Sequence, residues 1–156
     1  MGQVVFNEDT LRYVNLFQNV TRCLVVDCVE TEDKIIFVVA KGEASRAIGR
    51  KGETVTKVRQ MLKRDVQVVE FSDKPEEFVA NVFHAYDVKK VEIEDREGIT
   101  HATVTVETTL KGRAIGREGK NLRIARDLIS RHHAIDSVSV ALGIVRQVLG
   151  HSCEGV

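Results

Sequence analysis

The spacing of apolar residues in the first part of the chain predicts a helix followed by a β-hairpin. Apolar residues recur at helical spacing over residues 8–21, and Asn7 or Asp9 can cap the first turn of that helix. Two β-branched runs follow, at residues 24–29 and 34–40, with a short polar segment between them. That arrangement is typical of two antiparallel strands joined by a tight turn.

A buried strand and two further helices are predicted next. Residues 35–39 are apolar on both faces, which predicts a covered central strand. A short helix is expected at residues 44–48, a longer one at 53–63 and a strand at 66–71. The inner face of the longer helix is expected to consist of four apolar residues. They are Val55, Val58, Met61 and Leu62.

The same order of elements returns after residue 72. The elements expected there are a helix at residues 75–85, strands at 88–94 and 99–107, a short helix, a longer helix at 120–131 and a strand at 136–141. We therefore predict two modules, at residues 1–72 and 73–143, and a C-terminal extension at 144–156. Because the linker is short, we expect the modules to share an interface and to present their functional turns on one surface.

A glycine-bounded turn with basic residues occurs once in each predicted module. Arg46-Ala-Ile-Gly49-Arg50-Lys51-Gly52 returns 67 residues later as Arg113-Ala-Ile-Gly116-Arg117-Glu118-Gly119. Glycine allows a positive φ and a close approach of another backbone. The helix that follows each turn presents unpaired N–H groups and the positive end of its dipole. The pattern therefore predicts two phosphate-binding turns.

The distribution of charge supports a polyanionic partner. The chain has 23 basic and 23 acidic residues, so its formal net charge is zero. Residues 41–64 nevertheless carry a balance of +6 and residues 111–131 a balance of +5, which leaves −11 for the remainder. Concentration of positive charge around both turns indicates a nucleic-acid site. The alternative is a pair of solvated helices with surface arginines.

The order strand, helix, GxxG turn, helix, strand, preceded by an extra helix and strand, resembles the K-homology (KH) module in its type II arrangement. The signature residues are Ile48-Gly49-Arg50-Lys51-Gly52 and Ile115-Gly116-Arg117-Glu118-Gly119. This resemblance implies an α+β fold with two tandem type II KH modules, each a three-stranded mixed sheet covered by three helices. It also implies that each GxxG turn clamps a few nucleotides of single-stranded nucleic acid.

Two tandem modules in a chain of this length are similar to the archaeal-type NusA family of transcription factors. The second copy, residues 113–126, carries this resemblance most clearly. It implies single-stranded RNA binding during transcription termination or elongation, with RNA polymerase as a further candidate partner. The longer bacterial form also carries a polymerase-binding domain and an S1 domain, for which these 156 residues leave no room.

The candidate RNA-binding residues lie in the turns and on the helices beside them. Basic side chains are expected to contact phosphates, and the isoleucine before each turn is expected to line a groove for bases. The full set is Arg46, Ile48, Gly49, Arg50, Lys51, Gly52, Lys57, Arg113, Ile115, Gly116, Arg117, Glu118, Gly119, Lys120 and Arg123. Val55 and Leu122 could line the same groove, but both also fit the inner face of a helix.

Two features predict how binding is shared between the modules. Glu118 replaces Lys51, so the second turn has a formal charge of 0 where the first has +2. We therefore expect the first turn to contribute more of the salt dependence. All eight aromatic residues lie in residues 6–37 and 71–86, away from both turns in the sequence. Without aromatic stacking, each module is expected to bind weakly and the two to act together.

The sequence does not carry the motifs of catalytic or metal-binding proteins. Lys51 is followed by Gly52 and Glu53, whereas a P-loop requires GxxxxGK[ST]. The adjacent pair His132-His133 does not have the i, i+4 spacing of a helical zinc site and better suits a helix end or a phosphate contact. We therefore expect no catalytic residue, metal, cofactor or small-molecule substrate, and no enzyme.

The sequence also predicts a cytoplasmic protein without a membrane partner. No apolar run approaches the ~18 residues of a membrane span, and the N-terminus does not resemble a signal peptide. The three cysteines, Cys23, Cys28 and Cys153, form no CxxC pair, which favours a reducing compartment over a disulfide framework.

Two alternative functions use the same fold. The first is a protein-docking KH module of a polymerase or ribosome-assembly complex that has no RNA specificity of its own. The acidic remainder of the chain favours it, because that charge could meet a basic patch on a partner. The second is a ribosomal KH protein, but the long basic tails of such proteins are missing from this sequence.

Overall fold

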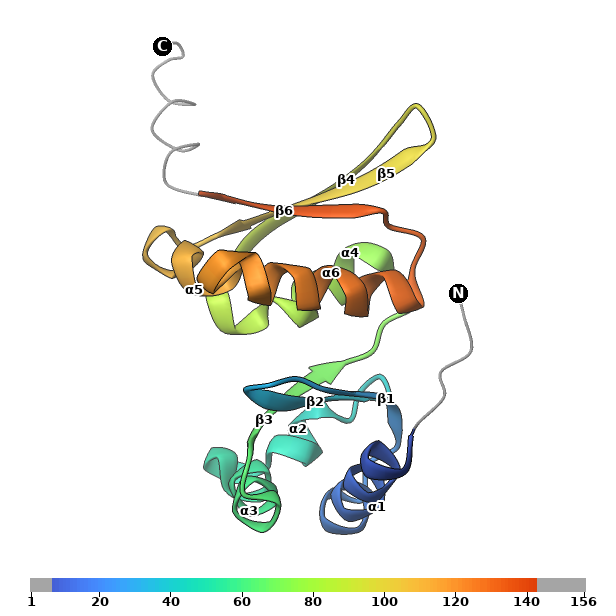
Figure 1. The fold of residues 1–156 in the computed structure, drawn as a ribbon, viewed down its shortest axis with the longest axis vertical. Helices are drawn as coiled ribbons and strands as arrows, with labels where there is room; N and C mark the ends of the chain where they lie inside the picture. The colour runs from blue at the N-terminus through green and yellow to red at the C-terminus, as the bar shows by residue number, and fades with distance from the viewer. Residues whose placement is uncertain (1–6, 143–156) are drawn as a thin grey trace. The chain divides into compact units, whose positions relative to one another are not determined.

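The chain folds into two compact units that meet in the sequence between Asp73 and Lys74. The computed structural model describes residues 7–142 (Figure 1). The first module comprises residues 7–73 and the second module residues 74–142. The predicted C-terminal extension at residues 144–156 lies outside the described residues.

The first module has one mixed sheet with its helices on one face (Figure 1). The elements in chain order are α1 (Glu8–Thr21), β1 (Val25–Glu30), β2 (Lys34–Val39), α2 (Ala44–Ile48), the 3₁₀ turn η1 (Arg50–Gly52), α3 (Glu53–Leu62) and β3 (Asp65–Glu70). The strand order is β1-β2-β3, with β1 antiparallel and β3 parallel to the central β2. The crossover from β2 to β3 contains the glycine turn.

The second module repeats this topology. Its elements are α4 (Pro75–Val82), η2 (His84–Tyr86), β4 (Val88–Arg96), β5 (Ile99–Val106), η3 (Thr108–Leu110), α5 (Lys111–Ile115), η4 (Arg117–Gly119), α6 (Lys120–His132) and β6 (Ser137–Leu142). The strand order is β4-β5-β6, again antiparallel and then parallel. The predicted fold class is confirmed: α+β, with two modules of three strands in a mixed sheet and three α-helices each.

Helix α1 is defined by clear signals at both ends. The Asn7 side chain accepts a hydrogen bond from the Thr10 N–H at 2.8 Å, as an N-cap residue does. The helix ends where Arg22 adopts a left-handed conformation with φ of 63°. Phe17 on its inner face stacks on Phe37 of β2, with ring centroids 4.1 Å apart. This contact anchors α1 to the central strand.

The core of the first module is built on β2, where Ile35, Phe37 and Val39 face α1 and α3 among other buried residues. Val55 and Val58 of α3 belong to this core, as predicted. Met61 does not, because its side chain is 51% exposed. Leu62, the next and last residue of α3, does pack against this core, so the inner face of the helix runs through Leu62 and not through Met61.

The hairpin of the second module is longer than its sequence predicted. A four-residue turn was expected at residues 95–98, but Asp95 and Arg96 continue β4 and pair with Thr100 and Ile99. The remaining turn consists of Glu97 and Gly98, with φ of 54° and 83°. Positive φ at both central residues is the geometry of a type I′ turn, whose twist matches that of the strands.

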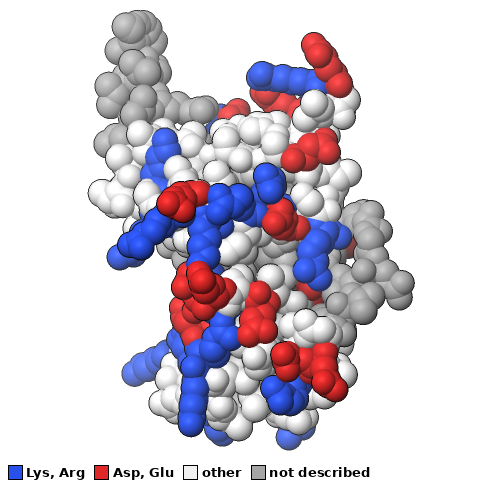
Figure 2. Space-filling view, in the orientation of Figure 1, with Lys and Arg blue, Asp and Glu red and all other residues white. Residues whose placement is uncertain are grey.

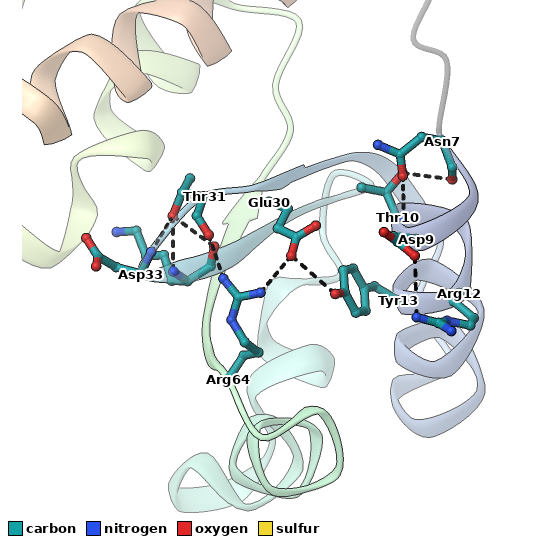
Figure 3. Close-up of polar contacts among 10 residues, drawn as sticks. Asn7, Asp9, Thr10, Arg12, Tyr13, Glu30, Thr31, Asp33 and Arg64 are labelled. Atoms are coloured by element: carbon teal, nitrogen blue, oxygen red, sulfur yellow. Dashed lines mark hydrogen bonds and ion pairs between the residues drawn. The ribbon is translucent and has the colours of Figure 1, made fainter.

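A polar cluster holds the hairpin turn of the first module against two other segments (Figure 3). Arg64, just before β3, forms an ion pair with Glu30 at 2.7 Å and donates to the Thr31 carbonyl at 2.5 Å. The Tyr13 hydroxyl of α1 donates to the same Glu30 carboxylate at 3.2 Å. The cluster therefore joins α1, the β1–β2 turn and the segment that follows α3.

Candidate nucleic-acid interface

The two glycine turns have the same backbone conformation. In the first turn (residues 49–52), Gly49 has φ of 81° and Lys51 has φ of 54°. In the second turn (residues 116–119), the corresponding angles are 79° at Gly116 and 56° at Glu118. The last glycine of each turn is also left-handed. The sequence repeat is therefore a repeat of local geometry, with different side chains on the same backbone.

The first glycine of each turn is required by packing as well as by its φ. A Cβ atom on Gly49 would lie 2.8 Å from the backbone nitrogen and the Cβ of Thr54, and would also overlap the Thr54 hydroxyl. A Cβ atom on Gly116 would lie 2.8 Å from the backbone nitrogen of Asn121. Real side chains do not approach backbone this closely, so both positions need glycine to let the turn pack on the following helix.

The second glycine of each turn faces open space instead. A Cβ atom on Gly52 would meet no atom within 4 Å, and one on Gly119 would meet only the Arg123 guanidinium, at 3.5 Å. Glycine is needed here for φ values of 76° and 75°, not to avoid a clash. The space above these two residues is available to a backbone from another molecule.

The helix N-termini beyond the turns are open, but part of their hydrogen-bonding capacity is already used. The Gly52 N–H donates to the Gly49 carbonyl at 3.1 Å, and the Glu53 N–H donates to the Arg50 carbonyl. The second turn has the same two bonds. No side chain caps α3 or α6. The positive end of each helix dipole is therefore exposed, while the first amides are engaged within the turn.

The basic side chains within the turns are exposed and unpaired. In the part of the chain that the structure describes, Arg50, Lys51 and Arg117 form no ion pair and no side-chain hydrogen bond. Figure 2 shows basic and acidic side chains interspersed over much of the face that it draws. Three unpaired cations in exposed turns are suited to contact phosphates without first breaking an internal ion pair.

The predicted basic residues beside the turns have more varied surroundings. Lys57 is exposed on α3. Arg46 on α2 donates to the Arg22 carbonyl at 3.0 Å, which directs its guanidinium toward the end of α1. Arg123 on α6 donates to the Glu118 carbonyl at 2.7 Å and so braces the second turn. Arg46 and Arg123 are therefore partly engaged in holding the fold.

The charges of the two sites are arranged differently but have the same sum over five residues. Glu53 is the first residue of α3, directly after the first turn, whereas Lys120 is the first residue of α6. Including this residue gives each site a formal balance of +1. The replacement of Lys51 by Glu118 therefore changes the position of the positive charge within the site and not its sum. In the first site it lies in the turn, and in the second it extends into the helix.

The isoleucines before the turns are accessible to a ligand. Ile48 is 41% exposed and Ile115 is half-buried, while the preceding Ala47 and Ala114 are fully buried. The helix that leads into each turn therefore packs on the core through alanine and leaves isoleucine accessible. Val55, considered for the same groove, is a core residue at 5% exposure.

An aromatic residue near the second turn was missed from the sequence. The short helix η2 packs against α5, the helix that leads into the second turn (Figure 1). This places Tyr86 beside Arg113. Burial raises the pKa of the Tyr86 hydroxyl, and the Arg113 charge opposes part of that shift. The expectation that no aromatic residue lies near either site is therefore wrong for the second module. The fold joins segments that are 27 positions apart.

Other kinds of site receive no support from residues 7–142. Within that range, no three His, Cys, Asp or Glu side chains are arranged to hold a metal ion. His132 and His133 are buried and lie beside Phe78, with ring centroids 5.5 and 5.4 Å away, so they do not form a phosphate contact on the surface. None of the helices in this range has the length and apolar character needed to cross a membrane.

Comparisons with known proteins find relatives over most of the chain. The family described as "NusA-like second KH domain" matches residues 75–141, and the family described as "KH domain" matches residues 13–73. A Halococcus morrhuae protein named "Probable transcription termination protein NusA" is 38% identical over 139 residues, covering 89% of this chain and 99% of the relative. A Thermoplasma acidophilum protein of the same name is 29% identical over 140 residues, covering 90% and 97%. The crystal structure of APE1850 has a TM-score of 0.67 and 32% identity, covering 86% of this chain and 99% of that chain.

Proposed function

The chain belongs to the NusA family of KH-domain proteins, and we propose that it binds single-stranded RNA through its two GxxG turns and acts in transcription termination or elongation. Its curated relatives are named as transcription termination proteins. KH domains as a class bind single-stranded nucleic acid, with the GxxG loop clamping about four backbone nucleotides. The proposal thus assigns the backbone contacts to residues 49–52 and 116–119.

The observation that carries this proposal is the pairing of bare backbone with unpaired cations in each turn. Open space lies above Gly52, and the neighbouring Arg50 and Lys51 have no internal ion pair. A phosphate can approach the glycine backbone closely while arginine and lysine neutralise its charge. Each contact of this kind releases counterions, which makes the binding salt-dependent.

Base contacts in this proposal come from the residues on the helices beside the turns. Ile48 and Ile115 offer aliphatic surface to an unstacked base. Such contacts need bases that are free of a duplex, so a single strand is favoured over double-stranded RNA. Because both modules lie in one chain, the second binding event is intramolecular, and joint binding is tighter than either module alone provides.

A direct test is fluorescence anisotropy with labelled single-stranded RNA and with the same sequence as a duplex. We expect binding of the single strand that weakens as salt rises, and much weaker binding of the duplex. The docking alternative predicts no salt-sensitive RNA binding but retention of RNA polymerase in a pull-down. Polymerase retention together with RNA binding would place the protein on the transcription complex.

A further inference from the structure

Tyr86 lies at the end of the second module's first helical segment, next to the helix that leads into its turn. It closes the 3₁₀ helix η2, where its N–H donates to the Phe83 carbonyl at 2.9 Å. Phe83 is 1% exposed, and the two rings are 6.4 Å apart at an interplanar angle of 58°. The buried Phe83 therefore supports one side of the Tyr86 ring, while packing of η2 on α5 fixes its position.

The tyrosine ring is only half-buried, and its hydroxyl has no structural role in the described residues. No hydrogen bond from the Tyr86 hydroxyl is formed within residues 7–142, whereas the hydroxyl of Tyr13 is bonded to Glu30. A tyrosine that serves only as a core residue normally places its hydroxyl on a partner. Because Tyr86 is half-buried, part of its side chain remains accessible to a ligand.

The setting of Tyr86 suits a nucleotide. Arg113 is close enough to influence the hydroxyl electrostatically, and it lies three residues before Gly116 of the second turn. An aromatic face beside an arginine can hold a base and its phosphate together. The location also continues the proposed backbone site, because α5 connects it directly to the turn.

The first module does not have this feature. Val25 and Val88 begin the first strands and pair with Val39 and Val106. The position that matches Tyr86, two residues earlier, is therefore Cys23, a buried residue. The residue that matches Arg113 is Arg46, whose guanidinium bonds the Arg22 carbonyl. The module whose turn carries two positive charges therefore has no aromatic residue at this place, and the module whose turn has no net charge has one.

We propose that Tyr86 is a base-stacking residue of the second module and that it replaces charge in the turn as the main source of that module's RNA affinity. This inference rests on the proposed RNA-binding function. The two modules then bind RNA in different ways. The first binds mainly through phosphate contacts, and the second combines fewer phosphate contacts with one stacked base. Stacking tolerates any base, so Tyr86 adds affinity without strict sequence preference.

The test uses the full chain labelled with 3-fluorotyrosine, because the sequence contains only two tyrosines. In a fluorine NMR titration with single-stranded RNA, the Tyr86 signal should shift on binding, while the Tyr13 signal serves as an internal control and stays in place. A Tyr86 signal that does not move, in a sample whose RNA binding is proved by anisotropy, overturns the inference but leaves the proposed function intact. A wild-type chain that binds no RNA overturns both.

Affinity measurements on variants give a second readout. Tyr86→Leu should weaken binding by about 5- to 150-fold, the range of one lost base stack, with the salt slope unchanged. Tyr86→Phe keeps the ring and should restore wild-type affinity. The matched control is Tyr13→Phe, which should have no effect on RNA binding. Equal affinity of Tyr86→Leu and wild type, or a failure of Tyr86→Phe to restore binding in a folded protein, contradicts the stacking role.

Discussion

Gly49 and Thr54 are packed so closely that no side chain fits at Gly49: a Cβ atom there would lie 2.8 Å from both the backbone nitrogen and the Cβ of Thr54. A Cβ atom added to Gly52, three residues later, would have no other atom within 4 Å. The two glycines of one GxxG turn therefore serve different purposes. Gly49 lets the turn pack on α3, and Gly52 keeps the outer surface of the turn bare.

This difference predicts opposite phenotypes for two alanine substitutions. Gly49→Ala should destabilise the chain by at least ~2 kcal/mol, because a clash with backbone adds to the strain of a positive φ. Gly52→Ala should cost only about 1 kcal/mol, since it introduces the left-handed strain alone, but it should weaken RNA binding by covering the turn. Thermal unfolding and RNA anisotropy measure both properties. Equal loss of stability in the two variants would contradict the assignment.

The salt dependence of RNA binding should come mainly from the first turn. Replacing Arg50 and Lys51 with alanine removes two unpaired cations and should reduce the slope of log K against log salt by about 1.4. Replacing Arg117 and Glu118 with alanine removes one cation and one anion, so the slope should change by less than about 1. The same oligonucleotide and buffer series serve both variants, and identical slopes would refute the asymmetry.

The ion pair between Arg64 and Glu30 should contribute to stability more than an exposed pair does. Its side chains are 27% and 34% exposed and joined at 2.7 Å, and Arg64 also bonds the Thr31 carbonyl. Arg64→Ala should therefore lower the unfolding free energy by about 1–2 kcal/mol. The control is Arg12→Ala. The side chains of Arg12 and its partner Asp9 are 74% and 66% exposed, so this substitution should leave the melting temperature nearly unchanged. Matching melting temperatures for the two variants would show that the Arg64 cluster is not stabilising.

Glu107 should make the stability of the second module sensitive to acid. Its side chain accepts hydrogen bonds from the Thr109 hydroxyl and from the Thr109 N–H, and these lower its pKa below the ordinary value of 4.5. The folded-state pKa lies below the unfolded one, so the contribution is complete above pH 4.5 and is lost as the pH falls through the depressed value. Wild type should exceed Glu107→Gln in melting temperature at pH 7, and the gap should close toward pH 3. A gap independent of pH would contradict this role.

Local signals in the sequence were sufficient for elements whose ends are set by neighbouring residues. Helix α1 begins after Asn7 as predicted, because an N-cap side chain acts on amides only two or three residues away. Helix α2 (Ala44–Ile48) was also placed correctly, since Gly49 ends it with a positive φ. The apolar run of β2 predicted a central strand, and β2 does pair on both sides.

Features that depend on where an element lies in the fold could not be predicted in this way. Met61 follows Val58 at a helical spacing of three, but the neighbouring Leu62 is the residue whose direction from the helix axis places it against the core. The extension of β4 to Arg96 depends on cross-strand pairing with Ile99. Tyr86 was assigned no role because its proximity to Arg113 results from packing of η2 on α5.

RNA binding through the two turns is tested by a chain in which both turns are made acidic. The variant carries Arg50→Asp, Lys51→Asp, Arg117→Asp and Glu118→Asp, all at exposed positions, so its melting temperature should stay close to that of wild type. Fluorescence anisotropy with single-stranded RNA at constant salt compares the two proteins. We predict that a folded variant loses at least ~100-fold in affinity. An unchanged dissociation constant in the folded variant would show that RNA, if bound, is bound elsewhere.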